Sequence, residues 1–542
     1  MKKITLLVFL LASLATNVSF AQSRLIWSSV SAQTNSQITD SRSFASDNAG
    51  NTYSVNFTQS ALSFYVTYVF YAHDANGLKL WEYVNDSCFT DCNDKYFNIV
   101  PVENNGAIFI GEYDDITGTQ IRIKRIDGSG TLLWQQYWIS PFLSAQPVKS
   151  VLDNNGHLVV GFSATVDSID QEDFAIAKFD TSTGFLDWHF ELPDGGLGSD
   201  PLSEIIASFT IDASNNIYGI GTATNSSVGI YKNYFFKLDD TGNLDYRLES
   251  SYSGINSNHQ SIQLDNAGNF YTLGFTGSQP VIEKRRASSG NMIWAAEITK
   301  DTAVLSNVGF SVIGNSIYSA SNFKYFNPDT SFAGGYWDNV HYMLTKLDTS
   351  GNFQWQKEYF TDADSLSTQE GYGGAVQFGV CDDKLYVLSS QHLDTLNNIL
   401  ILHSADTIGN TIWYDTASVN TVPGSFDFDD QCEIYLSRTF DNYNLTQKYT
   451  TAPLSEVTAL SKENIFDIYP NPAHDEFSIQ FRDGKIKNGF IQIYNSLGEI
   501  IKRQSVSGNN NKISISDMTP GFYFVQLISE NNGKFTKVLL KN

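Results

Sequence analysis

The chain has 542 residues, of which 17% are charged and 14% are aromatic, and its formal net charge is −24. These values exclude a disordered composition, and the negative charge repels phosphate backbones, so no nucleic-acid partner is expected. The 39 glycines, 28 tyrosines and 37 phenylalanines indicate an all-β fold with many turns.

The first 21 residues have the pattern of a secretion signal peptide. Lys2 and Lys3 precede the apolar run ITLLVFLLASLA, which is too short to favour a membrane-spanning helix. The small residues Ser19 and Ala21 place the cleavage after Ala21. We therefore expect a protein that passes through the periplasm and becomes extracellular or attached to the outer cell surface.

A hairpin in which an aromatic residue follows a glycine by four positions recurs along the chain. The seven pairs are Gly77 and Trp81, Gly130 and Trp134, Gly184 and Trp188, Gly242 and Tyr246, Gly290 and Trp294, Gly351 and Trp355, and Gly409 and Trp413. Glycine suits the positive-φ position that closes a short hairpin. We expect the aromatic residue to pack between adjacent sheets.

A second turn alternates with this hairpin. Its copies begin at Asp47, Glu103, Asp153, Asp212 and Asp265, with weaker copies near Gly314, Asp382 and Asp429. Each period therefore holds about four short strands, and four-stranded units repeated radially form a β-propeller. We expect a propeller over residues 22–450 with eight blades, or seven if one weak repeat is an insertion.

The last repeat has no glycine-to-aromatic strand after Asp429. The segment SRLIWSSV near the mature N-terminus carries Trp27 in a matching context. We expect this first strand to complete the final blade and close the ring.

The repeats also resemble known bacterial propeller families. The segment AKFDTSTGFLDW, residues 177–188, is similar to the docking motif of quinoprotein-like propellers, and the repeats as a whole resemble those of quinoprotein-like and SBBP proteins. The resemblance implies the fold and blade-to-blade packing. It implies no quinone or calcium site.

Four cysteines are present. Cys88 and Cys92 are close enough for a local disulfide, which an exported protein can form. Cys381 and Cys432 are 51 residues apart, about one repeat, and their pairing stays open at this point.

No sequence motif of a zinc protease, a serine hydrolase or a phosphate-binding loop occurs in the chain. We expect no cofactor, with calcium as the one possibility, because acidic loops offer oxygen ligands. Asp167, Asp170 and Asp173 in DSIDQED are weak candidate calcium ligands, and a solvated hairpin tip is the alternative.

An aromatic-rich insertion, NFKYFNPDTSFAGGYWDN, lengthens the sixth repeat at residues 322–339. It contains Tyr325, Phe332, Tyr336 and Trp337, and Tyr372 follows in the next connection. Exposed aromatic residues among polar ones stack on sugars or contact partner proteins. These residues are our candidate ligand site, and packing over the ring is the alternative.

Residues 451–465 have the small, polar composition of a linker. The turn and strand pattern of residues 466–542 predicts a small β-sandwich. The motifs YPNPAHDEFSI, IYNSLGEII, MTPGFYFVQL and GKFTKVLLKN follow in order to the end of the chain. This region resembles the C-terminal sorting domain of the type IX secretion system of Bacteroidetes. The sorting residues that the resemblance implies are Pro470, Asn471, Pro472, Gly498, Gly521 and Lys537.

The same resemblance implies recognition by the type IX translocon and its processing machinery, with removal of the tail after export. The sequence favours a non-enzymatic platform that binds a glycan or a protein through one face of the propeller. Two alternatives stay open, namely an extracellular hydrolase or lyase acting on a polysaccharide, and an architectural surface protein without a ligand.

Overall fold

The structure is a computed structural model. It describes residues 25–31, 44–59, 66–84, 95–115, 118–138, 144–165, 172–191, 203–225, 230–250, 258–276, 279–300, 303–327, 336–337, 341–359, 374–394, 397–417, 421–440, 443–451, 466–481, 488–494, 500–507, 511–516, 518–519, 521–529 and 534–541. The chain divides into two compact units, Met1–Thr451 and Ala452–Asn542.

The first unit is built from antiparallel sheets in which strands adjacent in sequence pair with each other. Sheet 1 contains β2 (Phe44–Ser46), β3 (Thr52–Gln59), β4 (Val66–His73) and β5 (Lys79–Val84). Sheet 2 contains β6 (Lys95–Val102), β7 (Gly106–Asp115), β8 (Gly118–Ile126) and β9 (Leu132–Trp138). Sheet 3 contains β10 (Ser144–Leu152), β11 (Leu158–Thr165), β12 (Glu172–Phe179) and β13 (Leu186–Glu191). Sheet 4 contains β14 (Ser203–Ile211), β15 (Ile217–Asn225), β16 (Ile230–Leu238) and β17 (Leu244–Glu249).

The same plan continues through the second half of the unit. Sheet 5 contains β18 (Asn258–Leu264), β19 (Asn269–Thr276), β20 (Gln279–Arg286) and β21 (Met292–Glu297). Sheet 6 contains β22 (Ala303–Ile313), β23 (Ser316–Asn327), β25 (His341–Asp348) and β26 (Phe353–Tyr359), with the short β24 (Tyr336–Trp337) paired to β23. Sheet 7 contains β27 (Gly374–Cys381), β28 (Lys384–Asp394), β29 (Asn397–Asp406) and β30 (Thr411–Ala417).

Sheet 8 joins strands from both ends of the unit. It has the order β31 (Thr421–Phe428), β32 (Ile434–Phe440), β33 (Tyr443–Tyr449) and β1 (Leu25–Ser31). The strand β1 is antiparallel to β33, with Trp27 opposite Lys448 and Ser31 opposite Asn444.

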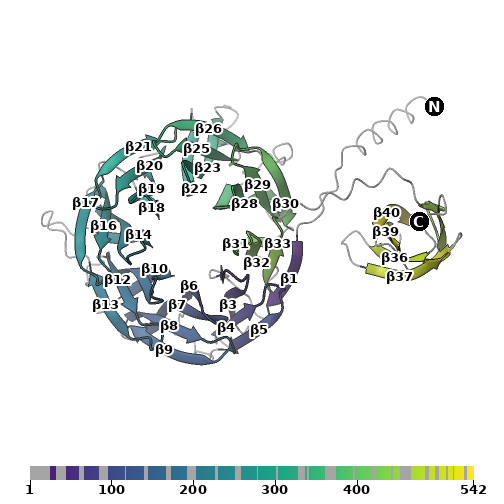
Figure 1. Ribbon diagram of the computed structural model, residues 1–542, viewed down its shortest axis with the longest axis horizontal. Helices are drawn as coiled ribbons and strands as arrows, with labels where there is room; N and C mark the ends of the chain where they lie inside the picture. The colour runs from purple at the N-terminus through teal and green to yellow at the C-terminus, as the bar shows by residue number, and fades with distance from the viewer. Residues whose placement is uncertain are drawn as a thin grey trace. The chain divides into compact units, whose positions relative to one another are not determined.

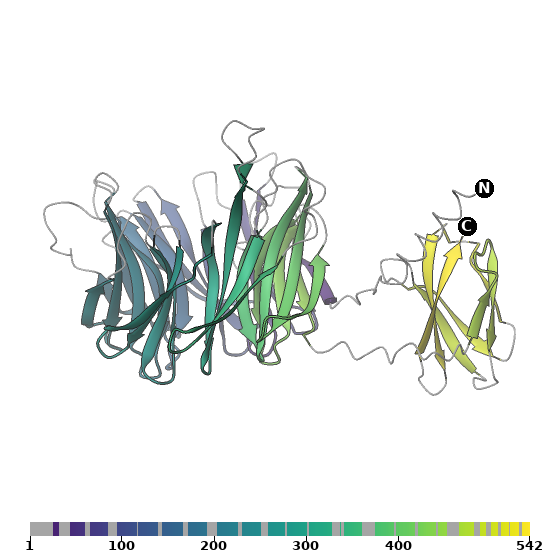
Figure 2. The ribbon, with the colours of Figure 1, turned by 90° about the horizontal axis from the view of Figure 1, so that it is seen from above.

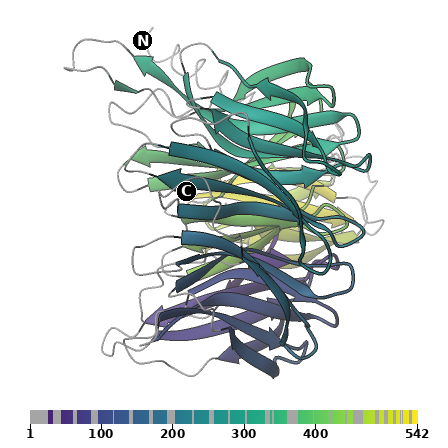
Figure 3. The same ribbon diagram turned by 90° about the vertical axis from the view of Figure 1, so that its left-hand side faces the viewer.

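The sheets of this unit are arranged around a common centre (Figure 1). The first strands of successive sheets, such as β10, β14 and β18, lie innermost, and the last strands, such as β13, β17 and β21, lie outermost. In the views of Figure 2 and Figure 3 the strands run between the two faces of the ring, so the turns gather on these faces.

The core of this unit lies between consecutive sheets. In sheet 4, for example, Tyr234, Phe235 and Phe236 are all buried although they are consecutive in a strand. Both faces of the strand are therefore covered: Phe236 packs in a cluster with Phe174 of sheet 3, and Phe235 packs in a cluster with Phe270 of sheet 5. Because the inner strands are covered on both faces, each sheet depends on its neighbours for burial.

The second unit is a pair of packed sheets. One sheet contains β34 (Phe466–Tyr469), β35 (Glu476–Phe481) and β38 (Asn511–Ser514). The other has the order β37 (Ile500–Ser507), β36 (Asn488–Tyr494), β39 (Gly521–Ser529) and β40 (Lys534–Lys541). Phe477 and Ile479 from the first sheet share one core with Ile491, Val525 and Leu539 from the second. Within the described residues, no helix is long and apolar enough to cross a membrane.

Candidate functional site

Six of the seven hairpin glycines lie against the aromatic residue of the preceding sheet. Gly184 has a φ of +76°, and a Cβ atom there would lie 2.6 Å from Cε3 of Trp134. At Gly242 the corresponding atom of Trp188 is also 2.6 Å away. The other contacts are Gly130 on Trp81, Gly290 on Tyr246, Gly351 on Trp294 and Gly409 on Trp355. Glycine is therefore needed for its backbone conformation and also for its lack of a side chain.

The same aromatic residues donate hydrogen bonds to the next sheet. Nε1 of Trp134 donates to the carbonyl oxygen of Thr181 at 2.9 Å. The equivalent bonds to the outer hairpin of the next sheet join Trp188 to Asp240, Tyr246 to Ala287, Trp294 to Thr349 and Trp355 to Thr407. Trp81 donates instead to Asn105 in the turn between β6 and β7. Each of these aromatic residues thus contacts the next sheet through its ring face and its polar atom. Trp413 packs against the core cluster between sheets 7 and 8, and the side chain of Trp27 lies outside the described residues.

The Asp residues of the second turn are held by their own chain. The Asp212 carboxylate accepts hydrogen bonds from the backbone of Ser214 and Asn216, from the Asn216 side chain and from the Tyr218 hydroxyl. Burial opposes ionisation, but these bonds outweigh it and lower the pKa of Asp212. Burial and the neighbouring Asp212 charge raise the pKa of Tyr218. Turn formation therefore accounts for the recurring Asp without any ligand.

A lysine from the neighbouring strand lies beside the Asp carboxylate of several of these turns. At three turns in which a Tyr follows the Asp by six residues, the lysine amine lies over the Tyr ring, as Lys284 does over Tyr271 at 4.9 Å. Tyr53 follows Asp47 by the same spacing but has Ala72 opposite it. Sheet 3 has Val159 at this position, and Lys178 instead contacts Asp153 at 2.6 Å. Burial again opposes ionisation there, but Lys178 and the backbone hydrogen bonds outweigh it and lower the pKa of Asp153.

The candidate ligand residues from the sequence fall mostly outside the described residues. Tyr325 lies in β23, and Tyr336 and Trp337 form β24, which pairs with the end of β23 through Phe326 opposite Trp337. The side chains of these three residues are not described, and Phe332 and Tyr372 lie outside the described residues altogether.

The candidate calcium ligands and the candidate local disulfide also fall outside the described residues, in whole or in part. Asp167 and Asp170 lie outside the described residues, and only the backbone of Asp173, in β12, is described. Cys88 and Cys92 also lie outside them. Among the residues that are described, no group of three or more His, Cys, Asp or Glu side chains has a metal-binding arrangement.

In the second unit, the PNPA segment after β34 is fastened to the last strand. The side-chain oxygen of Asn471 accepts a hydrogen bond from the backbone of Leu540 at 2.8 Å, and the backbone of Ala473 donates to the Leu540 carbonyl at 2.8 Å. Nζ of Lys541 donates to the carbonyl oxygen of His474 at 2.7 Å. Three contacts therefore hold the extreme C-terminal strand to the entry of the domain, and we call them the terminal clasp.

A lysine adds a charged contact between the same two ends. Nζ of Lys537 in β40 lies 2.8 Å from Oδ1 of Asp467 in β34 and 5.7 Å from the centre of the Phe466 ring. Tyr469, before the segment, is 76% exposed. Pro470 and Pro472 lie within the segment and Gly521 begins β39, whereas Gly498 lies outside the described residues.

The comparison with protein families identifies this unit. The family described as the secretion system C-terminal sorting domain matches residues 467–542. The chain is a type IX secretion substrate. The terminal clasp thus joins the segment after the first strand of a sorting domain to its last strand, and the ring of sheets before it in the sequence is the propeller-like cargo.

Other relatives match shorter stretches or only the fold. A stretch of 74 residues is 36% identical to beta-agarase A of Zobellia galactanivorans, and this stretch is 14% of the present chain and 13% of the agarase. Among solved structures, the Dos1 propeller is 9% identical with a TM-score of 0.48, covering 79% of this chain and 96% of that chain. The polysaccharide lyase Uly1 is 9% identical with a TM-score of 0.41, covering 77% and 91%. We draw no functional argument from likenesses of this size.

Two features were missed or left open by sequence reasoning. Cys381 and Cys432 form a disulfide with a Cα–Cα distance of 5.7 Å. Their spacing of about one repeat was the only signal, and it did not decide the pairing. The lysine contacts with the Asp turns were not predicted, although the lysine recurs two residues before the hairpin Asp at Lys178, Lys237 and Lys346.

Proposed function

We propose that this protein is a binding platform for a glycan or a protein, delivered to the cell surface or the medium of a Bacteroidetes bacterium. The sorting domain at residues 467–542 carries the proposal, because it assigns the chain to an export route that ends outside the outer membrane. In this proposal residues 1–21 are the signal peptide, residues 22–450 the propeller and residues 451–465 the linker that allows the tail to be handled and removed.

The platform is an eight-bladed propeller closed by its N-terminal strand. The eight sheets of the first unit and the antiparallel pairing of β1 with β33 support this arrangement. Closure between strands from both ends of the first unit makes the ring one rigid body, on which loops present ligand-binding side chains.

The ligand site lies on the aromatic insertion of sheet 6. With 12 residues, β23 is the longest strand of the first unit among those described, and its far end pairs with β24 at Tyr336 and Trp337. Tyr325, Phe332 and Tyr372 complete the aromatic group. Aromatic faces stack on the apolar faces of sugar rings, so a glycan is the first ligand to test.

An enzyme acting on a polysaccharide is the second candidate. The 74-residue likeness to beta-agarase A covers only 13% of the agarase and does not decide between the two candidates. An enzyme would release soluble oligosaccharides, whereas a binding platform leaves the glycan intact.

A glycan array tests the two candidates together. The purified full-length chain is applied with calcium and with a chelator, beside Trp337→Ala and the control Phe185→Ala, which removes an aromatic residue that is 67% exposed in the hairpin turn before β13. We expect binding that Trp337→Ala abolishes and Phe185→Ala retains. Loss of binding in chelator alone would support calcium at Asp167, Asp170 and Asp173.

The array, together with an assay for released oligosaccharides, can also contradict the proposed glycan platform. Absence of binding in both buffers would contradict a glycan platform and shift the proposal to a protein partner or an architectural role. Soluble oligosaccharides released from a bound glycan would favour the enzyme instead.

A further inference from the structure

Turns on one face of the ring contact the corresponding turns of the neighbouring sheet. The side chain of Asn51, between β2 and β3, donates to the side chain of Asn105, between β6 and β7, at 3.1 Å. Asn154 contacts Asn215 in the same way, between sheets 3 and 4. Each of these contacts joins a buried Asn to an exposed one by hydrogen bonds, and a single hydrogen bond stabilises a structure by only about 1 kcal/mol.

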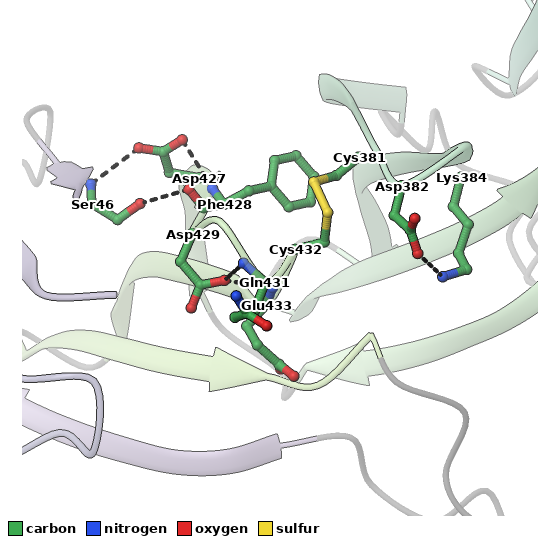
Figure 4. Close-up of a disulfide and its surroundings, with 10 residues drawn as sticks. All are labelled: Ser46, Cys381, Asp382, Lys384, Asp427, Phe428, Asp429, Gln431, Cys432 and Glu433. Atoms are coloured by element: carbon green, nitrogen blue, oxygen red, sulfur yellow. Dashed lines mark hydrogen bonds and ion pairs between the residues drawn. A yellow bond between two sulfur atoms is a disulfide. The ribbon is translucent and has the colours of Figure 1, made fainter. Parts of the chain in front are cut away.

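Between sheets 7 and 8 the corresponding contact is covalent. Cys381 ends β27, and Cys432 lies in the turn between β31 and β32, so their disulfide joins the two sheets (Figure 4). The cysteines are 51 positions apart in the sequence, and the chain between them contains the rest of sheet 7 and the first strand of sheet 8. A cross-link over a loop of this length removes much of the conformational freedom that local opening would gain.

The backbone at Cys432 shows that the residue is not there for the turn itself. Its φ is +58°, a left-handed conformation that residues with a side chain rarely adopt. The equivalent positions of other turns are Gly50, Gly156 and Gly268, with φ values of +82°, +82° and +75°, and Asn215, with a φ of +62°. Glycine and asparagine are the residues that adopt this conformation most readily. A cysteine at a position suited to glycine is unfavourable for the backbone, so a gain elsewhere must retain it, and the disulfide supplies that gain.

Sheet 8 is also the sheet on which closure of the ring depends. On its other side it contacts sheet 1 through hydrogen bonds. The backbone of Ser46 donates to the Asp427 carboxylate at 3.0 Å, and the backbone of Asp430 donates to the Asn48 carbonyl at 3.4 Å. Its outer strand, β1, is connected to the rest of the sheet only by pairing with β33, because the chain between them passes around the whole ring.

We infer that the Cys381–Cys432 disulfide is a redox-sensitive latch, by which we mean a cross-link that holds sheet 8 against sheet 7 until it is reduced. When it is oxidised, sheet 8 opens rarely. Reduction by two thiol equivalents yields the two cysteine thiols and one disulfide of the reductant, and sheet 8 then opens while sheets 2 to 5 keep their protection. Both cysteines are partly exposed, so a reductant reaches them without unfolding of the ring. The inference rests on the proposed closure of the ring by β1.

Hydrogen exchange of backbone amides tests the latch in the full-length chain. The samples are the oxidised protein, the protein in a phosphine reductant, and the variant Cys381→Ser/Cys432→Gly. Glycine at 432 relieves the left-handed backbone, so any loss of protection in the variant arises from the missing cross-link. The variant Cys88→Ser/Cys92→Ser, with and without reductant, is the control for the other two cysteines.

We expect reduction and the Cys381→Ser/Cys432→Gly variant to lower the protection of β1, β31, β32 and β33 on the order of 100-fold. Peptides from β11 and β12 should change little, and the Cys88→Ser/Cys92→Ser variant should match the wild type in both states. Unchanged protection of sheet 8 after complete reduction would overturn the latch. Absence of protection of β1 in the oxidised wild type would instead contradict the proposed closure of the ring.

Discussion

Two glycines of sheet 3 share a backbone conformation and differ in their surroundings. Gly184 and Gly156 have φ values of +76° and +82°. A Cβ atom at Gly184 would lie 2.6 Å from Trp134, whereas one at Gly156 would meet nothing within 4 Å. The pair separates the role of glycine in the turn from its role in packing between sheets.

We predict that Gly184→Ala destabilises the propeller more than Gly156→Ala does. Both variants strain the left-handed backbone at a cost of about 1 kcal/mol. Gly184→Ala also forces Trp134 away from its packing, which adds roughly 1–3 kcal/mol. Urea unfolding of the full chain measures the difference, and equal unfolding free energies would contradict the packing role of the glycine.

A buried histidine between sheets 6 and 7 makes the propeller sensitive to acid. His403 is 4% exposed, its Nδ1 lies 2.8 Å from the Tyr342 hydroxyl and its Nε2 lies 3.0 Å from the Thr411 hydroxyl. The ring of Tyr359 packs beside it at 4.7 Å. Burial among these neutral groups lowers the pKa of His403 to about 4.

The sign of the resulting pH dependence follows from this lowered pKa. Between pH 6.5 and 4 the unfolded chain binds a proton at His403 that the folded chain does not, so stability falls as the pH falls through this window. The loss is on the order of 3 kcal/mol by pH 4. We predict a flatter pH profile for His403→Gln than for the wild type in thermal unfolding. Identical slopes for the two proteins would show that His403 takes no part.

At the residue scale, the sequence predicted which residues recur at the contacts between sheets, but it did not predict which residues they contact. The recurrence of an aromatic residue four positions after glycine predicted contacts between sheets. Side chains at the same position of equivalent strands point to the same face of their sheets, so each aromatic residue meets the equivalent neighbour. The recurrence did not identify the carbonyl of Thr181 as the acceptor for Trp134, since that depends on how the two sheets are offset. The same offset decides which cysteines meet, so the Cys381–Cys432 pairing was not predictable from spacing alone.

At the scale of elements, β1 is separated in sequence from the sheet that it completes. Its residues pair with β33 from Leu25 opposite Tyr449 to Ser31 opposite Asn444. The sequence pointed to this pairing because the last repeat lacked one strand and a matching tryptophan segment occurred at the other end. The sequence pattern did not predict the register, that is, which residue of β1 lies opposite which residue of β33.

We predict that a chain lacking residues 22–31 loses the protection of sheet 8. Removal of β1 leaves one edge of β33 without its hydrogen bonds, at a cost of roughly 3 kcal/mol or more. A synthetic peptide of residues 22–33 should restore thermal stability, and a scrambled peptide of the same composition should not. A deletion variant as stable as the full chain would contradict the closing role of β1.

The terminal clasp is the element on which we expect export to depend. Asn471→Ala removes the acceptor for the Leu540 amide at a cost of about 1 kcal/mol, whereas Asn471→Asp keeps an oxygen there. We predict that Asn471→Ala reduces the extracellular amount of the protein and the amide protection of β40, and that Asn471→Asp retains more of both. Export of Asn471→Ala at the wild-type level would show that the clasp is dispensable.

At the scale of the whole molecule, the export signal and the exported domain are separate units of the chain: the sorting domain is the second unit, and the propeller is the first. The order of four motifs in the tail was specific enough to predict the sorting domain from sequence, and the family match at residues 467–542 confirms it. The repeats predicted a propeller because each sheet buries its faces only against its neighbours. A ligand was not predictable, because the aromatic insertion that we propose as its site does not follow the repeat.

Secretion with and without the tail is the measurement that tests the account most directly. The full chain and a chain ending at Thr451 would be produced in a type IX-competent bacterium and in the same strain without its translocon, and the propeller would be quantified outside the cells. We predict that the propeller appears outside only when both the tail and the translocon are present. Equal amounts outside the cells without the tail or without the translocon would contradict the account.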